Sequence, residues 1–174
     1  MLVNFVGFNA GWFGCVLAAA AGLPWAGPVG VAALAALHLW MTPDRRRELG
    51  LLAAVAVLGT VIDSVQMKLG VFSFPGAAAG ATVCPLWLSA MWVNFALTLH
   101  VSGSWLRGRY AVAAALGAVA GPASYCAGAR MGAMRLHPDP AVALPALVFE
   151  WSLAMPLLLK AAAWTEPRPG ERCS

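Results

Sequence analysis

The sequence predicts an all-α, polytopic membrane protein: a bundle of six transmembrane helices with both termini in the cytoplasm. Apolar residues make up 61% of the 174-residue chain and charged residues 10%, against roughly 45–50% and 25% in ordinary soluble domains. The mean hydropathy is +0.76. The apolar residues lie in runs close to the roughly 20 residues that a spanning helix needs, and Lys and Arg gather at alternate ends of these runs. A water-soluble globular domain is therefore excluded.

Charged and Gly/Pro-rich positions divide the chain into six apolar segments, all of which we expect to be helical. They are residues 3–22, 24–41, 49–70, 84–106, 110–129 and 141–163. The second segment is the weakest, because Pro24 and Pro28 shorten its uninterrupted part below the usual spanning length. Turn-rich connections are expected around 71–83 and 130–140. We expect a single transmembrane helical domain over residues 1–164 and a short cytoplasmic tail over 165–174.

The basic residues predict the orientation, because basic loops are retained in the cytoplasm. Eight of the eleven Lys and Arg side chains fall on one side of a six-helix arrangement: Arg45, Arg46, Arg47, Arg107, Arg109, Lys160, Arg168 and Arg172. The other side has Lys68, Arg130 and Arg135. This bias places both termini in the cytoplasm. The basic residues sit in short loops and form no extended patch, so nucleic acid is not an expected partner.

Two acidic residues fall inside apolar segments, whereas the other five, Glu48 among them, are expected in loops or the tail. A charge at the centre of a bilayer costs at least about 2.5–3.5 kcal/mol and is rarely retained without a role. At a rise of about 1.5 Å per residue, Asp63 lies about 10 Å and Glu150 about 14 Å from the outer ends of their helices. The two carboxyl groups are therefore expected to share one polar layer in the outer half of the bundle.

Two interpretations of this layer stay open. The first is structural, with Asp63 paired to Arg130 and Glu150 bonded to Tyr125 or a backbone carbonyl. The second is a catalytic or binding pocket in which a buried carboxyl transfers a proton. On this interpretation Asp63, Glu150 and Tyr125 are the catalytic candidates. The substrate-binding candidates are Gln66, Trp87, Trp92, Asn94, Ser124, Arg130 and Trp151.

Two histidines lie at a similar depth on different helices, toward the cytoplasmic side. His38 and His100 match the requirement for two axial ligands of a b-type haem, which gives a minor alternative function as an electron carrier. Neither helix offers a close additional His, Cys or carboxylate, so no metal site is predicted. Apart from this alternative, no cofactor is predicted.

Three stretches resemble a family of small, uncharacterised bacterial inner-membrane proteins that share a domain of unknown function. They are LGTVIDSVQMKLGVFSF from Leu58 to Phe74, PLWLSAMWVNFALTLHVSGSWLRGR from Pro85 to Arg109 and GAVAGPASYCAGARMGA from Gly117 to Ala133. The resemblance implies a compact multi-pass protein of the bacterial inner membrane, connected with membrane-lipid modification. It implies no established activity.

The leading functional hypothesis is that the bundle handles an apolar membrane molecule, a fatty-acyl lipid or an isoprenoid. It would act as a small lipid-modifying enzyme that uses a buried carboxyl for proton transfer, or as the membrane partner of such an enzyme; a homo-oligomer is also compatible. The expected cavity is lined by Trp12, Trp87, Trp92, Phe95, Trp151 and Met155. The alternative from another class is a transporter or channel subunit whose intramembrane carboxylates relay protons or bind a cation.

Overall fold

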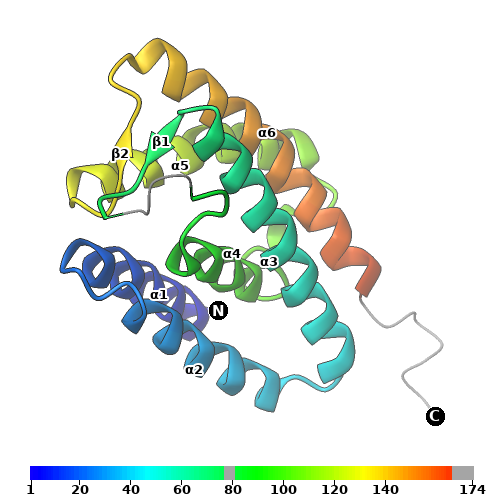
Figure 1. The fold of residues 1–174 in the computed structure, drawn as a ribbon. Helices are drawn as coiled ribbons and strands as arrows, with labels where there is room; N and C mark the ends of the chain where they lie inside the picture. Colours follow the sequence, from blue (N-terminus) through cyan, green and yellow to red (C-terminus); the bar gives the residue numbers. More distant parts are fainter. Residues whose placement is uncertain (77–80, 166–174) are drawn as a thin grey trace.

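Helices dominate the computed structural model, which describes residues 1–76 and 81–165. Within these residues there are six α-helices (Figure 1): α1 Leu2–Ala20, α2 Ala26–Met41, α3 Arg45–Lys68, α4 Leu86–Leu99, α5 Tyr110–Arg130 and α6 Pro140–Thr165. A short 3-10 helix, Ser104–Leu106, follows α4, and two strands, β1 Phe72–Ser73 and β2 Arg135–Leu136, have two residues each. The prediction of an all-helical fold is confirmed. The predicted tail, apart from Thr165, lies outside the described residues.

Two helix boundaries differ by four residues or more from those predicted, each for a local reason. Helix α3 begins at Arg45 and not at residue 49, because the Asp44 carboxylate accepts the backbone N–H of Arg47 at 3.2 Å and caps the helix. Helix α4 ends at Leu99 and not at residue 106. Beyond it the chain turns back at Gly103, whose N–H donates to the Thr98 carbonyl at 2.8 Å.

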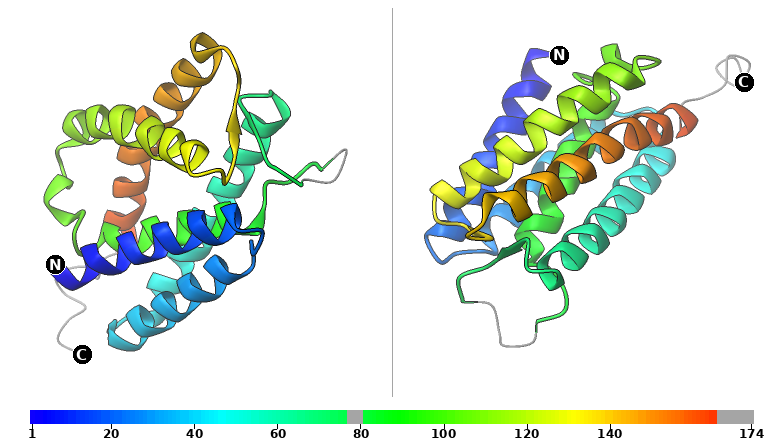
Figure 2. Two further views of the ribbon diagram at one scale, coloured as in Figure 1. Left: turned by 90° about the vertical axis from the view of Figure 1, so that its left-hand side faces the viewer. Right: turned by 90° about the horizontal axis from the view of Figure 1, so that it is seen from above.

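The helices alternate in direction, so the start of α1 and the end of α6 lie at the same end of the bundle (Figure 2, right). Two hydrogen bonds define this end. Asn4 donates to the Leu97 carbonyl at 2.9 Å, and the Ala162 carbonyl accepts from His100 at 2.9 Å. The α3–α4 and α5–α6 connections lie at the opposite end, where β1 pairs antiparallel with β2 and Phe72 faces Leu136.

This two-stranded ladder is a feature that the sequence did not predict. Its register pairs Phe72 with Leu136 and Ser73 with Arg135, and the N–H of His137 adds a bond to the Val71 carbonyl at 2.8 Å. Phe72 is 1% exposed and packs against the rings of Phe74 and Tyr125. The ladder therefore joins the α3–α4 connection to the α5–α6 connection. It covers the core at this end of the bundle.

Four helices, α1, α3, α5 and α6, are long and apolar enough to cross a membrane, whereas α2 and α4 are shorter. Large apolar side chains such as Val57, Val119 and Phe149 are more than 60% exposed on the outside of the bundle. Several polar groups are buried inside it, among them Asp63 and Asn94. An apolar exterior over a partly polar interior indicates a membrane protein.

Candidate functional site

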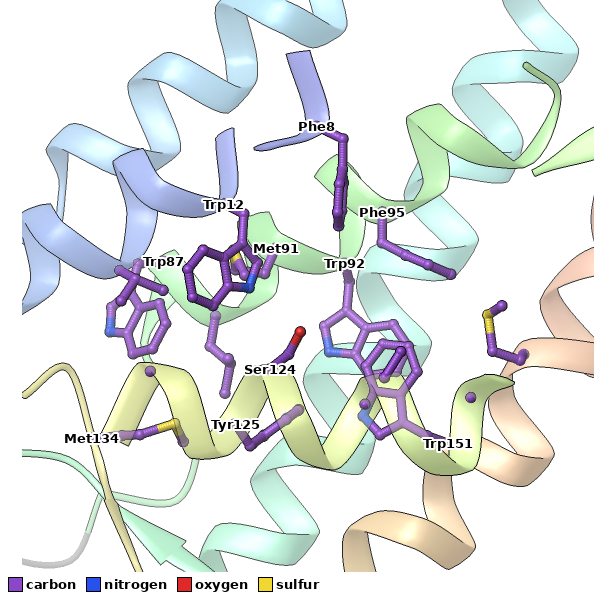
Figure 3. A pocket seen from close by; sticks show the side chains of 17 residues that line it. Phe8, Trp12, Trp87, Met91, Trp92, Phe95, Ser124, Tyr125, Met134 and Trp151 are labelled. Carbon is purple, nitrogen blue, oxygen red and sulfur yellow. The ribbon is translucent and has the colours of Figure 1, made fainter. Parts of the chain in front are cut away.

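A cavity of about 220 Å³ lies between α1, α4, α5 and α6. Aromatic side chains from all four helices form its wall (Figure 3): Phe8, Trp12, Trp87, Trp92, Phe95, Tyr125 and Trp151. The remaining lining is mostly aliphatic or methionine, and the Ser124 hydroxyl points into the space. A concave, mainly apolar site with a few polar groups is the usual form of a small-molecule site.

Glycines on neighbouring helices make room for the two tryptophans at the centre of this wall. The rings of Trp92 and Trp151 stack with their centroids 4.9 Å apart and their planes 5° from parallel. A Cβ atom at Gly59 would collide with the Trp92 ring, and one at Gly121 would collide with Trp151. Small residues allow such close approach of helices in membranes, so the glycines set the positions of both indoles.

Asp63 lies behind this wall and not on it. The side chain is 0% exposed, and its two oxygens accept the Trp92 indole N–H at 2.6 Å and the Tyr125 hydroxyl at 2.5 Å. Both donors line the cavity, whereas Asp63 does not. One carboxyl group on α3 therefore fixes the orientation of cavity side chains from α4 and α5.

Glu150 belongs to a neighbouring part of the same polar layer. It is 8% exposed, and its Oε2 accepts a hydrogen bond from the Gln66 side-chain amide. The remaining side-chain oxygens of Gln66 and Glu150 are buried and have no hydrogen-bond partner among residues 1–76 and 81–165. Asp63 and Gln66 are about one helical turn apart on α3, and Gln66 bonds Glu150 on α6, so the two carboxyl groups lie at a similar level of the bundle, which agrees with the depth argument.

The hydrogen-bond partners of this layer differ from those predicted. The structural interpretation paired Asp63 with Arg130, and Glu150 with Tyr125 or a backbone carbonyl. Arg130 is instead exposed at the end of α5, and Tyr125 donates to Asp63. The prediction fixed the depth of each group but not the direction in which it leaves its helix, and this direction selects the partner.

The predicted site residues divide into two groups in the structure. Trp87, Trp92, Ser124, Tyr125 and Trp151 line the cavity, as do Trp12, Phe95 and Met155. Asp63, Gln66, Glu150, Asn94 and Arg130 do not. Asn94 is 1% exposed and donates to the Phe8 carbonyl at 2.9 Å, so it joins α4 to α1. The chemical role of each residue stays a prediction.

The two histidines meet at a carboxylate that the sequence analysis placed in a loop. Glu48 lies in the first turn of α3 and is 4% exposed. Its Oε1 is 2.8 Å from His38 Nε2, and its Oε2 is 2.7 Å from His100 Nδ1. The second ring nitrogen of His100 contacts the Ala162 carbonyl at 2.9 Å. These contacts link four helices, and haem ligation by the two histidines stays a prediction.

A model of the family described as "Protein of unknown function (DUF2878)" matches residues 1–157. The chain belongs to this family. The match covers the cavity wall and the polar layer behind it, so both lie within the family's domain, and the predicted membership of a family of unknown function is confirmed. Comparison with curated proteins and with solved structures gives no match.

Sequence reasoning missed part of the cavity wall in this DUF2878 protein. Phe8, Met91 and Met134 line the space but were not selected. Phe8 and Met91 belong to runs that are apolar on several faces, so no local pattern marks the buried face. Met134 follows α5 and comes back over Gly128, with its sulfur 3.7 Å from the position of a Cβ there. The Gly128 spacing alone gave no indication of this return.

Proposed function

We propose that this is an integral protein of the bacterial inner membrane in which all six helices cross the bilayer, with both termini in the cytoplasm. The alternating helix directions and the exposed apolar exterior support it. The eight-to-three distribution of basic residues supports the orientation. The short helices α2 and α4 are flanked by apolar residues suited to the membrane interface: Leu23 and Trp25 before α2, and Trp105 and Leu106 after α4.

Reporter fusions test this topology. We expect green fluorescent protein to fluoresce when fused after Arg46, Arg107 or Thr165. Alkaline phosphatase should be active when fused after Trp25, Gly76 or Asp139, because it folds only outside the cytoplasm. Active phosphatase after Thr165 would contradict the orientation. Reporters that place Trp25 and Arg46 on the same side would remove α2 from the spanning helices.

The function that the cavity supports best is binding of an apolar membrane molecule, a fatty-acyl lipid or an isoprenoid. The observation that carries this proposal is the wall of aromatic side chains contributed by four helices. An apolar cavity of about 150 Å³ stays dry and takes up benzene, so a cavity of about 220 Å³ suits part of a hydrocarbon chain. The Ser124 hydroxyl offers one contact for an oxygen atom or a double bond of that chain.

The polar layer defines which reaction such a site would perform as a lipid-modifying enzyme. Tyr125 is the titratable side chain that lines the cavity, and its hydroxyl donates to Asp63. A phenol that is hydrogen-bonded to a buried carboxyl group suits proton transfer. We therefore place Tyr125 at the ligand and Asp63 behind it as a positioning residue. The transporter alternative receives less support, because both oxygens of Asp63 are already held by protein donors.

A substitution at the rim of the cavity tests ligand binding. Ala120 is exposed on α5 and lines the cavity, so Ala120→Phe fills space without displacing a packed side chain. We expect the lipid that co-purifies in mild detergent to fall at least about tenfold, measured by mass spectrometry of extracts, which corresponds to about 1.4 kcal/mol of binding free energy.

The matched control is Ala115→Phe, at an exposed alanine of the same helix that does not line the cavity. The proposal is wrong if both variants retain the same lipid as the unmodified protein, or if no specific lipid co-purifies at all. An absorption spectrum of the same sample separates the haem alternative, which requires a Soret band.

A further inference from the structure

A second cavity, of about 580 Å³, lies beside the first at the end of the bundle that holds the start of α1. Its wall comes from the first turns of α1, the end of α4, the 3-10 helix and α6, and includes Leu2, Phe5, Thr98, Ser102 and Trp105. The two cavities share three lining residues: Phe8, Phe95 and Met155.

The shared residues place the two cavities side by side, with side chains at their boundary. Phe8 and Phe95 meet edge to face, with ring centroids 6.4 Å apart and an angle of 71° between the rings. Neither side chain is fully buried. Side-chain rotamers change in picoseconds to nanoseconds where packing allows. A change of rotamer at either ring therefore moves this boundary without any movement of a helix.

The two cavities differ in their position along the bundle. The second lies where the chain leaves the helices, and Trp105, which is 48% exposed, is at its rim. Thr98 and Ser102 are part of its lining, and the Ser102 hydroxyl donates to the Asn4 side-chain oxygen at 2.6 Å. Tryptophan rings prefer the membrane–water interface, at the level of lipid headgroups. The first cavity lies deeper along α4 and is walled by aromatic rings.

We propose that the two cavities form one groove along α4 for a single long-chain amphiphile, with its polar end at Trp105 and Ser102 and its chain in the first cavity. This inference rests on the proposed function and specifies its ligand as a lipid with one hydrocarbon chain. The chain passes between Phe8 and Phe95. Ser124 and Tyr125 then meet a part of the chain remote from the polar end.

Photo-crosslinking with two fatty acids tests the direction and the extent of the groove. One probe has a diazirine at the methyl end, and the other has it next to the carboxyl group. In the full-length protein in lipid nanodiscs, we expect the methyl-end probe to label first-cavity residues such as Met91 or Met134. The carboxyl-end probe should label Leu2, Phe5 or Trp105. Reversed labelling, or labelling of one cavity by both probes, would overturn the proposal.

A blocking variant separates this proposal from the proposed function. The Thr98 hydroxyl donates only within its own helix, to the Phe95 carbonyl at 2.7 Å, so Thr98→Phe fills the second cavity. We expect crosslinking by the carboxyl-end probe to fall about tenfold. Ser152→Phe is the matched control, because Ser152 makes the same type of bond, to Phe149 at 2.8 Å, and lines neither cavity.

Each outcome of these variants is distinct. If Ala120→Phe removes the co-purified lipid while Thr98→Phe changes no crosslink, the single groove is wrong and the proposed function stands. If neither cavity is labelled and Ala120→Phe has no effect, both are wrong. Competition by an unlabelled polyprenol and by an unlabelled fatty acid identifies the chain: the stronger competitor is the class that the groove accepts.

Discussion

Replacement of Asp63 by Ala is expected to lower the free energy of unfolding by about 4 kcal/mol. The substitution leaves the Trp92 indole N–H and the Tyr125 hydroxyl without their acceptor. Each buried donor that loses its partner costs roughly 1–3 kcal/mol, and the missing carboxyl group adds a cavity. Denaturant titration of the purified protein in detergent, followed by tryptophan fluorescence, measures this change.

A double-mutant cycle separates the contribution of the two hydrogen bonds to Asp63 from the cost of the cavity that Asp63→Ala leaves. Tyr125→Phe removes one donor and keeps the ring, and Trp92→Phe removes the other donor with part of the indole. We expect the cost of Asp63→Ala to be smaller in either background, because one orphaned donor is then absent. Independent, additive costs would show that Asp63 stabilises the fold without holding these side chains.

The same substitution has a functional consequence if Asp63 positions the cavity wall. Trp92 stacks on Trp151 and Tyr125 packs against Phe72, so their release loosens the wall on two sides. Asp63→Asn keeps the shape of the side chain. Its NH₂ group, however, then faces either the Trp92 indole N–H or the Tyr125 hydroxyl, which are both donors. It should therefore retain more lipid than Asp63→Ala and less than the unmodified protein.

Most of the fold could be predicted from the sequence because apolar runs of spanning length leave the chain few choices. A backbone in lipid must satisfy its hydrogen bonds internally, so each run becomes a helix. Successive helices that cross a bilayer must alternate in direction, because each one begins on the side where the previous one ends. The ladder of Phe72–Ser73 with Arg135–Leu136 could not be predicted in this way. It depends on two distant connections meeting at one end of the bundle, which no local pattern encodes.

The candidate site was predictable in depth but not in rotation. The rise per residue placed Asp63 and Glu150 correctly relative to each other. The direction of each side chain depends on which helices approach closely, and this is set by contacts such as Gly59 against Trp92 and Gly121 against Trp151. The hydrophobic pattern carries little of this information, because in a membrane the outside of a helix is as apolar as its buried face.

Glu48 shows a different error, in which a buried position within a helix is taken for a loop. It follows three arginines, so composition placed it outside the helix. The Asp44 cap starts α3 before the arginines and moves Glu48 into the first turn, on the face toward α2 and α4. Acidic residues are favoured in the first turn of a helix. Asp44, a capping residue directly before Arg45 and four positions before Glu48, was the signal that could have revealed it.

The second large effect is therefore expected at Glu48. One carboxylate bonds His38 on α2 and His100 at the end of α4, and His100 also contacts the Ala162 carbonyl of α6. These bonds join four helices at one end of the bundle. Both imidazoles are half-buried. If the Glu48 carboxylate is removed, water therefore replaces only part of the hydrogen bonding that the two rings lose.

Glu48→Ala is expected to lower the free energy of unfolding by about 2–3 kcal/mol, because two half-buried imidazoles lose a shared acceptor. Glu48→Gln should cost less, since its amide can accept from one imidazole and donate to the other.

Asp44→Ala is the control: it removes an acidic side chain one turn earlier, where the loss of an exposed helix cap costs about 1 kcal/mol. Denaturant titration of the three variants in the same detergent compares them. If Glu48→Ala costs no more than Asp44→Ala, the histidine contacts contribute nothing beyond the start of α3. A cost two to three times that of the cap, reduced in Glu48→Gln, would establish that this carboxylate holds the helix ends together.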